Sequence, residues 1–355
     1  MTGTLDPTIP SVLQPDVLDN RTLDSVRALM QEGSSPNTAS AYGAAIRYWA
    51  AWYALRYRQA FSLPLPAQVV VQFLVDHALR SEQEGLACDL PQAVDEELVR
   101  QKVKGREGPL SLNTIQHRLS VLSKAHQVKG HENPCRSPAV QELLARVRRA
   151  YARRNAVPAR KDALTRDVLE KLLATCDESL RGRRDAALLL FAWSTGGRRR
   201  SEVVAATLDN TVRVAEGAYL YTMNRSKTNQ TGMARANDAK PVAGKAAQAL
   251  DRWLQASGID SGPIFRRVRR GNVVGEPLTA AAVRNIVLER CRMAGVEGDF
   301  SAHSLRSGFV TEAGRRQIPL GETMALTGHS SVSTVIGYFR AGDVLTSPAA
   351  RLFDE

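Results

Sequence analysis

The chain has 355 residues, of which 43% are hydrophobic and 24% charged, and this length exceeds what one hydrophobic core usually organises. We therefore expect a globular protein of two domains. No apolar run approaches the roughly 18 residues of a membrane span, and residues 1–30 lack the pattern of a secretory signal, so the cytoplasm is the expected location. The net charge of +12 favours a polyanionic partner such as nucleic acid. Four dispersed cysteines form no CxxC pair, so neither a disulfide framework nor a zinc site is indicated.

The first helix is predicted to begin near residue 36, where Ser35 can cap it and Pro36 suits the first helical position. Its apolar residues recur at helical spacing and predict a stripe that faces a core. This stripe consists of Tyr42, Ile46, Trp49 and Tyr53. The amino-terminal third is predicted to be a helical bundle.

Three further helices of this bundle are predicted over 66–79, 110–130 and 137–154. On the helix over 110–130, one face carries apolar residues and a histidine that we interpret as a residue of the core edge rather than a ligand. These residues are Ile115, Leu119, Leu122 and His126.

Residues 80–110 switch from acidic to basic with little apolar periodicity, which predicts a surface insertion that is dispensable for the core. Residues 155–165 have the proline and the charges of an interdomain linker. We therefore expect a flexible segment over 1–35, a helical domain over 36–154 and a second domain over 166–355.

The second domain is predicted to be mainly helical with a small antiparallel sheet. Helices near 166–176 and 183–197 precede two alternating segments, 211–232 and 234–243, which are typical of strands. Helices resume at residue 245 and are predicted to continue to the end.

Short stretches of the second domain concentrate groups that can bind and activate a phosphodiester. In "TGGRRRSEVV", Glu202 can orient the guanidinium of Arg199, and only this one of the three arginines keeps a three-residue step to the carboxylate. In "AHSLRSG", the three-residue spacing places the imidazole of His303 beside the forked cation of Arg306.

A lysine, a second histidine and a tyrosine complete this set. The stretch "NRSKT" puts Lys227 at the tip of the predicted hairpin, and "TGHSSVSTVIGYFR" places His329 nine residues before Tyr338. Each motif alone is common at solvated or structural positions. Together, two arginines, two histidines, a lysine and a late tyrosine are the groups needed to attack a phosphate with a hydroxyl.

These residues resemble the tyrosine recombinases of the phage integrase family, and within it the Cre-like simple site-specific recombinases. The family's first motif, an Arg followed three residues later by Glu, matches Arg199 and Glu202, and its hairpin lysine matches Lys227. Its second motif is HxxR, then GH or GW, then the Tyr. That motif matches His303, Arg306, His329 and Tyr338. The similarity covers residues 36–355 and includes "WAAW" and "TIQ" in the first domain.

The resemblance implies a mainly α fold with two domains that clamp DNA. Residues 36–154 would be a core-binding, SAM-like helical bundle, and residues 166–355 a mostly helical catalytic domain with a small antiparallel sheet and a carboxy-terminal helix that docks on a neighbouring subunit. It also implies side chains that read DNA. These are Thr38, Arg47, Asn113, Gln116, His117 and Arg284.

The implied partner is a double-stranded DNA recombination site, bound by a homotetramer with a dimer at each site, while the free protein is a monomer. The protein would be associated with the nucleoid and would need no membrane and no cofactor.

The implied reaction is attack of Tyr338 on the scissile phosphate, which forms a 3′ phosphotyrosine link on the way to a Holliday junction without metal or ATP. The other groups take these roles: Arg199 and Arg306 clamp the phosphate oxygens, His303 is the base, His329 donates to the phosphate and Lys227 protonates the leaving 5′ oxygen. A type IB topoisomerase or a hairpin telomere resolvase would use the same groups. A DNA-binding regulator without activity would keep only the fold.

Overall fold

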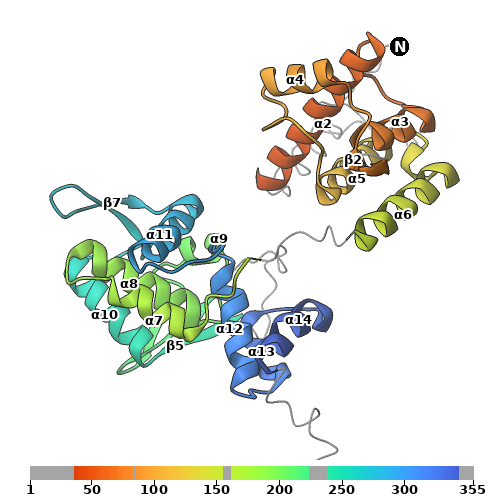
Figure 1. Ribbon diagram of the computed structural model, residues 1–355. Coiled ribbons are helices and arrows are strands. Elements are labelled where there is room, and N and C mark those ends of the chain that lie inside the picture. Colours follow the sequence, from red (N-terminus) through yellow and green to blue (C-terminus); the bar gives the residue numbers. More distant parts are fainter. Residues whose placement is uncertain (1–35, 83–84, 155–160, 224–237, 344–355) are drawn as a thin grey trace, which may run out of the picture. The chain divides into compact units, whose positions relative to one another are not determined.

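The computed structural model describes residues 36–82, 85–154, 161–223 and 238–343 (Figure 1). The chain divides into two compact units, Met1–Pro158 and Ala159–Glu355, each with its own hydrophobic core. Helices dominate both units and small antiparallel sheets complete them, which confirms the predicted fold class. No helix of the described residues is long and apolar enough to cross a membrane. The segment predicted to be flexible, 1–35, lies outside the described residues.

The amino-terminal unit is a helical bundle with one small hairpin. Its elements are α2 (Pro36–Tyr57), α3 (Ala67–His77), β1 (Arg80–Glu82), β2 (Gly85–Ala87), α4 (Gln92–Arg100), α5 (Leu112–Val128), the 3-10 turn η1 (Pro134–Arg136) and α6 (Pro138–Arg153). Ser111 and Ser137 cap α5 and α6, because each side chain accepts a hydrogen bond from a backbone N–H of the first turn.

The core of this unit forms where α2, α3 and α5 meet. Trp49 stacks on Phe73 with ring centroids 3.9 Å apart, and its indole donates to the carbonyl of Arg118 at 3.0 Å. Trp52 is also fully buried and donates to Asp76 Oδ2 at 2.8 Å. The predicted stripe of α2 is therefore wrong in part, since Trp49 is its only fully buried member. The buried residues of α2 are Ala45, Tyr48, Trp49 and Trp52.

The face predicted for α5 is confirmed, because all of its members are buried. Within it, His126 accepts a hydrogen bond on Nε2 from the backbone N–H of Leu65 at 3.0 Å and donates from Nδ1 to the carbonyl of Leu122 at 2.9 Å. Both ring nitrogens are therefore used inside the bundle, and His126 is a core residue.

Most described residues of 80–110 are exposed, as expected of a surface insertion, but the expectation that this segment is dispensable for the core is wrong. The hairpin β1–β2 and the loop over 105–109 are mainly exposed. Helix α4 contributes Leu98, fully buried in the core, and a buried ion pair joins Asp95 to Lys104. The short helix escaped the periodicity argument because, apart from Leu98, it presents only two half-buried valines and an alanine among acidic and polar residues.

The carboxy-terminal unit is mostly helical. Its elements are α7 (Arg166–Ala174), α8 (Leu180–Ser194), α9 (Arg200–Val204), β3 (Thr211–Ala215), β4 (Ala218–Thr222), β5 (Ala239–Ala243), α10 (Lys245–Ser257), β6 (Arg266–Arg269), β7 (Val273–Pro277), α11 (Ala280–Met293), α12 (Ser304–Arg315), α13 (Leu320–Thr327) and α14 (Val332–Asp343).

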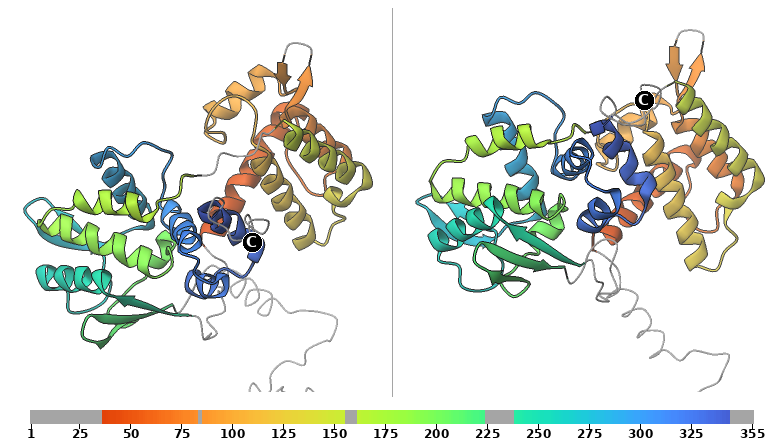
Figure 2. Two further views of the ribbon diagram at one scale, coloured as in Figure 1. Left: turned by 60° about the horizontal axis from the view of Figure 1, so that its bottom comes forward. Right: turned by 90° about the horizontal axis from the view of Figure 1, so that it is seen from below.

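The predicted antiparallel sheet is confirmed as β3–β4–β5, whose inner face packs against α8 and α10 (Figure 2). A second hairpin, β6–β7, lies in the region that was predicted to be helical throughout, so that expectation is wrong. Gly271 and Asn272 at its turn both take a positive φ, 82° and 58°, which matches the tight turns that join antiparallel strands.

Helices α12 and α14 pack closely along each other. A side chain at Gly314 of α12 would place its Cβ 2.1 Å from the carbonyl oxygen of Phe339 on α14, a distance that only glycine permits. The hydroxyl of Thr311 donates to the carbonyl of Tyr338 at 3.3 Å. Gly314 and Thr311 of α12 therefore help to fix the position of α14, the helix that carries Tyr338.

Candidate active site

The turn between α8 and α9 separates two neighbouring arginines. Arg199 lies at the first position before α9, where its Nη1 donates to Glu202 Oε1 at 2.6 Å and its backbone N–H donates to Oε2 at 3.1 Å. Its side chain remains 27% exposed, whereas that of Arg198 is 1% exposed and donates to the carbonyls of Leu326 and Thr327. Arg199 therefore has the guanidinium that an incoming anion can reach.

Glu202 is ionised beneath these arginines. Its burial would raise the pKa of the carboxyl group, but the charge of Arg198 and the hydrogen bond from Arg199 lower it below its usual value. The carboxylate thus holds Arg199 from two sides, as the sequence predicts.

Arg306 lies on α12 and is 2% exposed. Its Nε donates to His329 Nε2 at 3.1 Å and its Nη1 to the carbonyl of Gly197 at 3.3 Å, while its buried Nη2 has no hydrogen-bond partner among the residues that the structure describes. A side chain at Gly197 would place Cβ 2.2 Å from the Cα of Arg306. The turn between α8 and α9, which we call the arginine turn, therefore approaches α12 closely. An unpaired buried donor is costly and marks a place for an acceptor.

His329 follows the end of α13 and is held in one tautomer. Because the Nε of a guanidinium can only donate, Nε2 of His329 must accept, and the proton lies on Nδ1, which donates to Thr327 Oγ1 at 2.7 Å. Burial, followed by the charges of Arg306 and Arg199, lowers the pKa of His329 to about 4. The imidazole is therefore neutral near pH 7.

His303 immediately precedes α12 and keeps an exposed side chain. Desolvation by the surrounding chain, and then Arg306 and Arg199, lower the pKa of His303. A neutral, accessible imidazole beside two guanidinium groups can accept a proton.

Around Arg306 the structure brings together Arg199, Glu202, His303 and His329. Each of these four residues interacts electrostatically with Arg306 or with its hydrogen-bond partner His329. Tyr338 is half-buried on α14, the helix that packs against α12. Lys227 lies in 224–237, outside the described residues, between β4 and β5.

Residues 162–343 match the model of the phage integrase family. The chain belongs to the phage integrase family. Among its relatives, an integrase/recombinase XerD homolog from Selenomonas ruminantium is 30% identical over 247 residues, which cover 67% of this chain and 71% of the relative. Recombinase Cre from Escherichia phage P1 is 24% identical over an alignment of 366 residues that covers 98% of this chain and 96% of Cre. The resemblance to tyrosine recombinases of this family is thereby confirmed.

Solved structures of other family members share the fold. A fragment of lambda integrase, as a dimer bound to a COC′ core site, has a TM-score of 0.54 at 19% identity and covers 90% of this chain and 95% of its own. XerH recombinase bound to a palindromic difH substrate has a TM-score of 0.50 at 18% identity, with 75% and 71% covered. At these identities the likeness concerns the fold.

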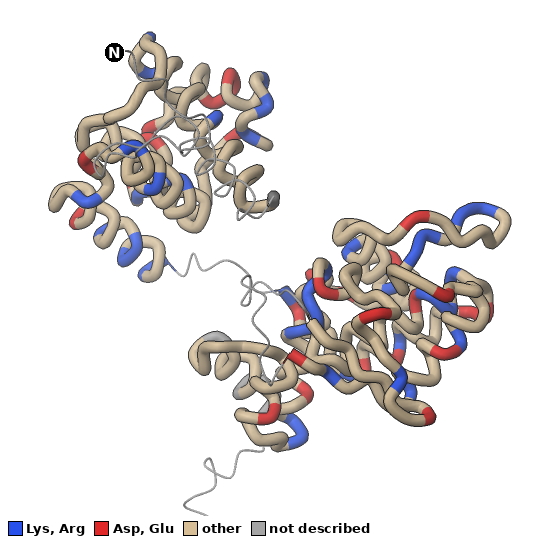
Figure 3. Tube along the Cα trace, turned by 180° about the vertical axis from the view of Figure 1, so that it is seen from behind, with Lys and Arg blue, Asp and Glu red and all other residues tan. Residues whose placement is uncertain are grey.

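The predicted DNA-reading residues of this family member lie mostly on exposed helix faces. Thr38 and Arg47 on α2 are exposed, as are Asn113 and His117 on α5, while Gln116 is half-buried. The rings of Tyr42 and His117 meet edge to face with centroids 6.4 Å apart, which joins these faces of α2 and α5. Figure 3 shows further basic residues along α6, where Arg146, Arg149 and Arg153 are exposed.

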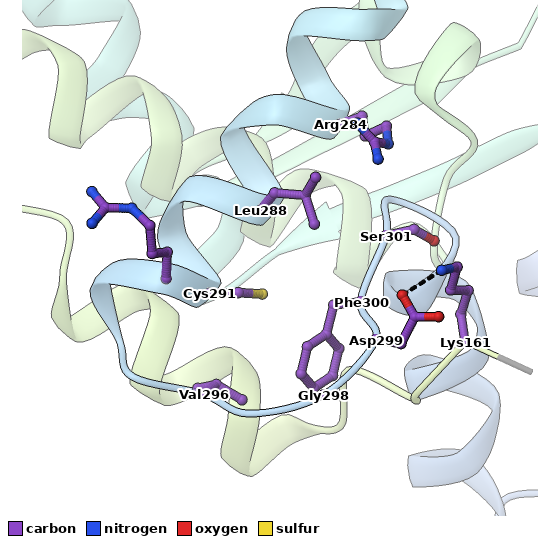
Figure 4. Close-up of a pocket in the computed structure, with 10 residues that line it drawn as sticks. Lys161, Arg284, Leu288, Cys291, Val296, Gly298, Asp299, Phe300 and Ser301 are labelled. Atoms are coloured by element: carbon purple, nitrogen blue, oxygen red, sulfur yellow. Dashed lines mark hydrogen bonds and ion pairs between the residues drawn. The ribbon is translucent and has the colours of Figure 1, made fainter. Parts of the chain in front are cut away.

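Arg284 lies on α11 beside a hollow of about 350 Å³ in the carboxy-terminal unit (Figure 4). Lys161, Asp299 and Ser301 line its other side, and Lys161 forms an ion pair with Asp299. The side chain of Arg284 is exposed at this edge.

Sequence reasoning missed Lys240, a fully buried lysine of the carboxy-terminal unit. Its Nζ donates to the carbonyl of Ala325 at 2.5 Å, and it interacts electrostatically with Arg198 and Arg306. The available signal was the alternation of β5, which places Lys240 and Val242 on the same inward face.

Proposed function

We propose that this chain is a site-specific recombinase that cuts and rejoins duplex DNA through a 3′ phosphotyrosine link to Tyr338 and a Holliday junction. The observation that carries the proposal is the environment of Arg306. Its buried Nη2 has no partner within 36–82, 85–154, 161–223 and 238–343, although groups suited to phosphate chemistry surround it. A phosphate oxygen would satisfy this nitrogen once the side chains that cover it shift.

The proposed attack begins with removal of the Tyr338 proton. At a pKa near 10 only about a thousandth of a tyrosine population is ionised at pH 7, so a base is needed. His303 fits this role because it is accessible and its pKa is lowered. Arg199 and Arg306 would stabilise the charge that develops on the non-bridging oxygens.

His329 would donate a hydrogen bond to the same phosphate. Its Nε2 carries no proton while it accepts from Arg306, so donation requires protonation of this nitrogen. The negative charge of the scissile phosphodiester, which grows in the transition state, would favour the protonated form, because an opposite charge raises the pKa of an imidazole. Binding of DNA would thus convert His329 from an acceptor into a donor.

Lys227 would protonate the departing 5′ oxygen, since an alkoxide is a poor leaving group. The phosphotyrosine link preserves the energy of the phosphodiester, so another strand's 5′ hydroxyl can reverse the step without ATP. The positive charges of Arg199 and Arg306 would serve in place of a metal ion.

Recognition would involve the exposed faces of α2 and α5 and the edge of α11, where polar side chains can contact bases or phosphates. The two domains, joined over 155–165, would close around a recombination site in a homotetramer. The tail, residues 343–355, would dock on a neighbouring subunit.

Incubation of the purified protein with the DNA that flanks its own gene, followed by sequencing of the junctions, tests this function. Junctions that exchange two sites support a recombinase. Relaxed plasmid without exchange would favour a topoisomerase, closed hairpin ends a telomere resolvase, and binding without any covalent product a regulator.

A further inference from the structure

The carboxyl end of α13 is held by two buried cations that come from distant parts of the chain. Lys240 Nζ donates to the carbonyl of Ala325 at 2.5 Å, across 85 residues of sequence. Arg198 Nη2 donates to the carbonyls of Leu326 and Thr327, both at 2.8 Å. The last carbonyls of a helix lack partners within it and carry partial negative charge, so both cations suit this place.

These cations lie in an environment that does not favour them. Both residues are 2% exposed or less, and they repel each other, since each lies near the other's charge. Burial, and next the charge of Arg198, lower the pKa of Lys240 to about 8. Glu202, 3.6 Å from Arg198 Nη1, offsets part of this repulsion. Burying two like charges close together costs free energy, so their presence at the end of α13 indicates a role beyond packing.

The turn that they hold carries the histidine of the active site. Thr327 is fully buried and is followed by Gly328, with a φ of 70°, and then by His329. Thr327 Oγ1 accepts the proton of His329 Nδ1, and this bond leaves Nε2 free to accept from Arg306. A displacement of the last turn of α13 would therefore move the imidazole and remove its tautomeric control.

The arginine turn also contacts the carboxyl end of α13. A side chain at Gly196 would place Cβ 2.6 Å from the carbonyl oxygen of Leu326, so this turn and the end of α13 are in direct contact. Arg198 thus faces the helix end while its neighbour Arg199 faces the accessible side of the site.

We propose that Arg198 and Lys240 are positioning residues for the recombination reaction: together they fix the carboxyl-terminal turn of α13, so that His329 meets Arg306 in one tautomer and one orientation. In this proposal neither residue contacts the reacting atoms. The role in catalysis rests on the proposed function, whereas the control of the imidazole is a property of the protein without DNA.

Nuclear magnetic resonance of the full chain labelled with nitrogen-15 in histidine tests the structural part without any substrate. The wild type should show His329 protonated on Nδ1 and unprotonated on Nε2. In Lys240→Met this pattern should change to a mixture of tautomers, while the signals of buried His126 stay as in the wild type. Lys245→Met, which changes an exposed lysine at the start of α10, is the matched control and should leave His329 unchanged. Wild-type signals of His329 in Lys240→Met would overturn the proposal.

Single-turnover cleavage tests the catalytic part. A misplacement of about 1 Å at a reacting centre can cost about 100-fold, so Lys240→Met should cleave about 10- to 100-fold more slowly with unchanged duplex affinity. The loss should be equal on DNA with oxygen or sulfur at the bridging 5′ position. Restoration by sulfur would make Lys240 the proton donor and would overturn the positioning role. An inactive wild type with the expected His329 tautomer would instead refute the proposed function.

A second variant keeps the test decisive if Lys240→Met does not fold. Thr327→Val preserves the shape of the side chain and removes only the hydroxyl that receives the His329 proton. It should alter the same nitrogen signals and slow cleavage. Unaltered signals would show that the end of α13 does not control His329.

Discussion

Replacement of Glu202 by glutamine tests how the arginine turn is held. The carboxylate is 3% exposed, its Oε1 lies 2.6 Å from Arg199 Nη1 and its Oε2 lies 3.6 Å from Arg198 Nη1. Removing one member of a buried ion pair costs about 3–5 kcal/mol, because the other charge stays buried without compensation. Glutamine keeps the volume and one acceptor, so Glu202→Gln should lower the free energy of unfolding by about 3 kcal/mol.

The pH dependence of this loss follows from the direction of the pKa shift. The folded pKa of Glu202 lies below its usual value of 4.5, so its carboxylate stabilises the fold fully above that pH and stops doing so as the pH falls through the folded value. The difference between wild type and Glu202→Gln should therefore be constant from neutral pH down to about 5 and shrink below about 4.5.

Urea unfolding of the full chain, followed by circular dichroism at several pH values, measures this difference. For a unit of this size the loss corresponds to a fall in melting temperature of about 6–12 °C. Glu289→Gln, which changes an exposed partner of Arg292, is the control and should leave the stability nearly unchanged. Equal stability of Glu202→Gln and wild type near pH 7 would refute the reasoning.

Three other predictions concern the core, Lys227 and residues 343–355. Leu98→Ala should destabilise the amino-terminal unit by about 2–5 kcal/mol, because Leu98 is fully buried, while Leu86→Ala on the exposed hairpin should have little effect. Equal effects of the two variants in thermal unfolding would show that α4 does not contribute to the core. Lys227→Ala should cleave ordinary DNA slowly but DNA with sulfur at the bridging 5′ position near the wild-type rate, since a thiolate leaves without a proton. Arg306→Ala should cleave both substrates slowly. Equal impairment of Lys227→Ala on the two substrates would reject the role of Lys227 as the general acid. Deletion of 343–355 should impair synapsis and recombination more than binding to a single site in mobility-shift assays, and normal recombination by the truncated chain would contradict docking in trans.

The helical bundle could be predicted where apolar residues have one clear period. On α5 the face with Ile115 and His126 could be recognised, because most residues on the other sides are polar. On α2, aromatic residues and alanines surround the helix, so several stripes were possible. Partners 24 and 69 residues away in sequence, Asp76 and the carbonyl of Arg118, accept hydrogen bonds from the indole groups of the buried Trp52 and Trp49. Such tertiary partners are absent from a local pattern.

The candidate active-site residues could be proposed as a set from the sequence, since their chemistry is carried by residue types and short spacings. The division of labour between Arg198 and Arg199 could be chosen only through the step to Glu202, and the use of Arg198 by the end of α13 depends on a contact across 128 residues. Lys240 escaped for the same reason, because a lysine in a short strand normally reaches solvent. The sequence therefore identifies reactive groups more readily than the residues that position them.

The central claim is that Tyr338 is the nucleophile, and a denaturant-resistant adduct between protein and DNA measures it most directly. Full-length wild type and Tyr338→Phe should be incubated with a nicked duplex of the recombination site, which traps the cleaved strand, and analysed by denaturing electrophoresis. We predict an adduct for the wild type, carried on a peptide containing Tyr338, and none for Tyr338→Phe, with duplex affinity nearly equal for both. An adduct of wild-type yield from Tyr338→Phe would contradict the account.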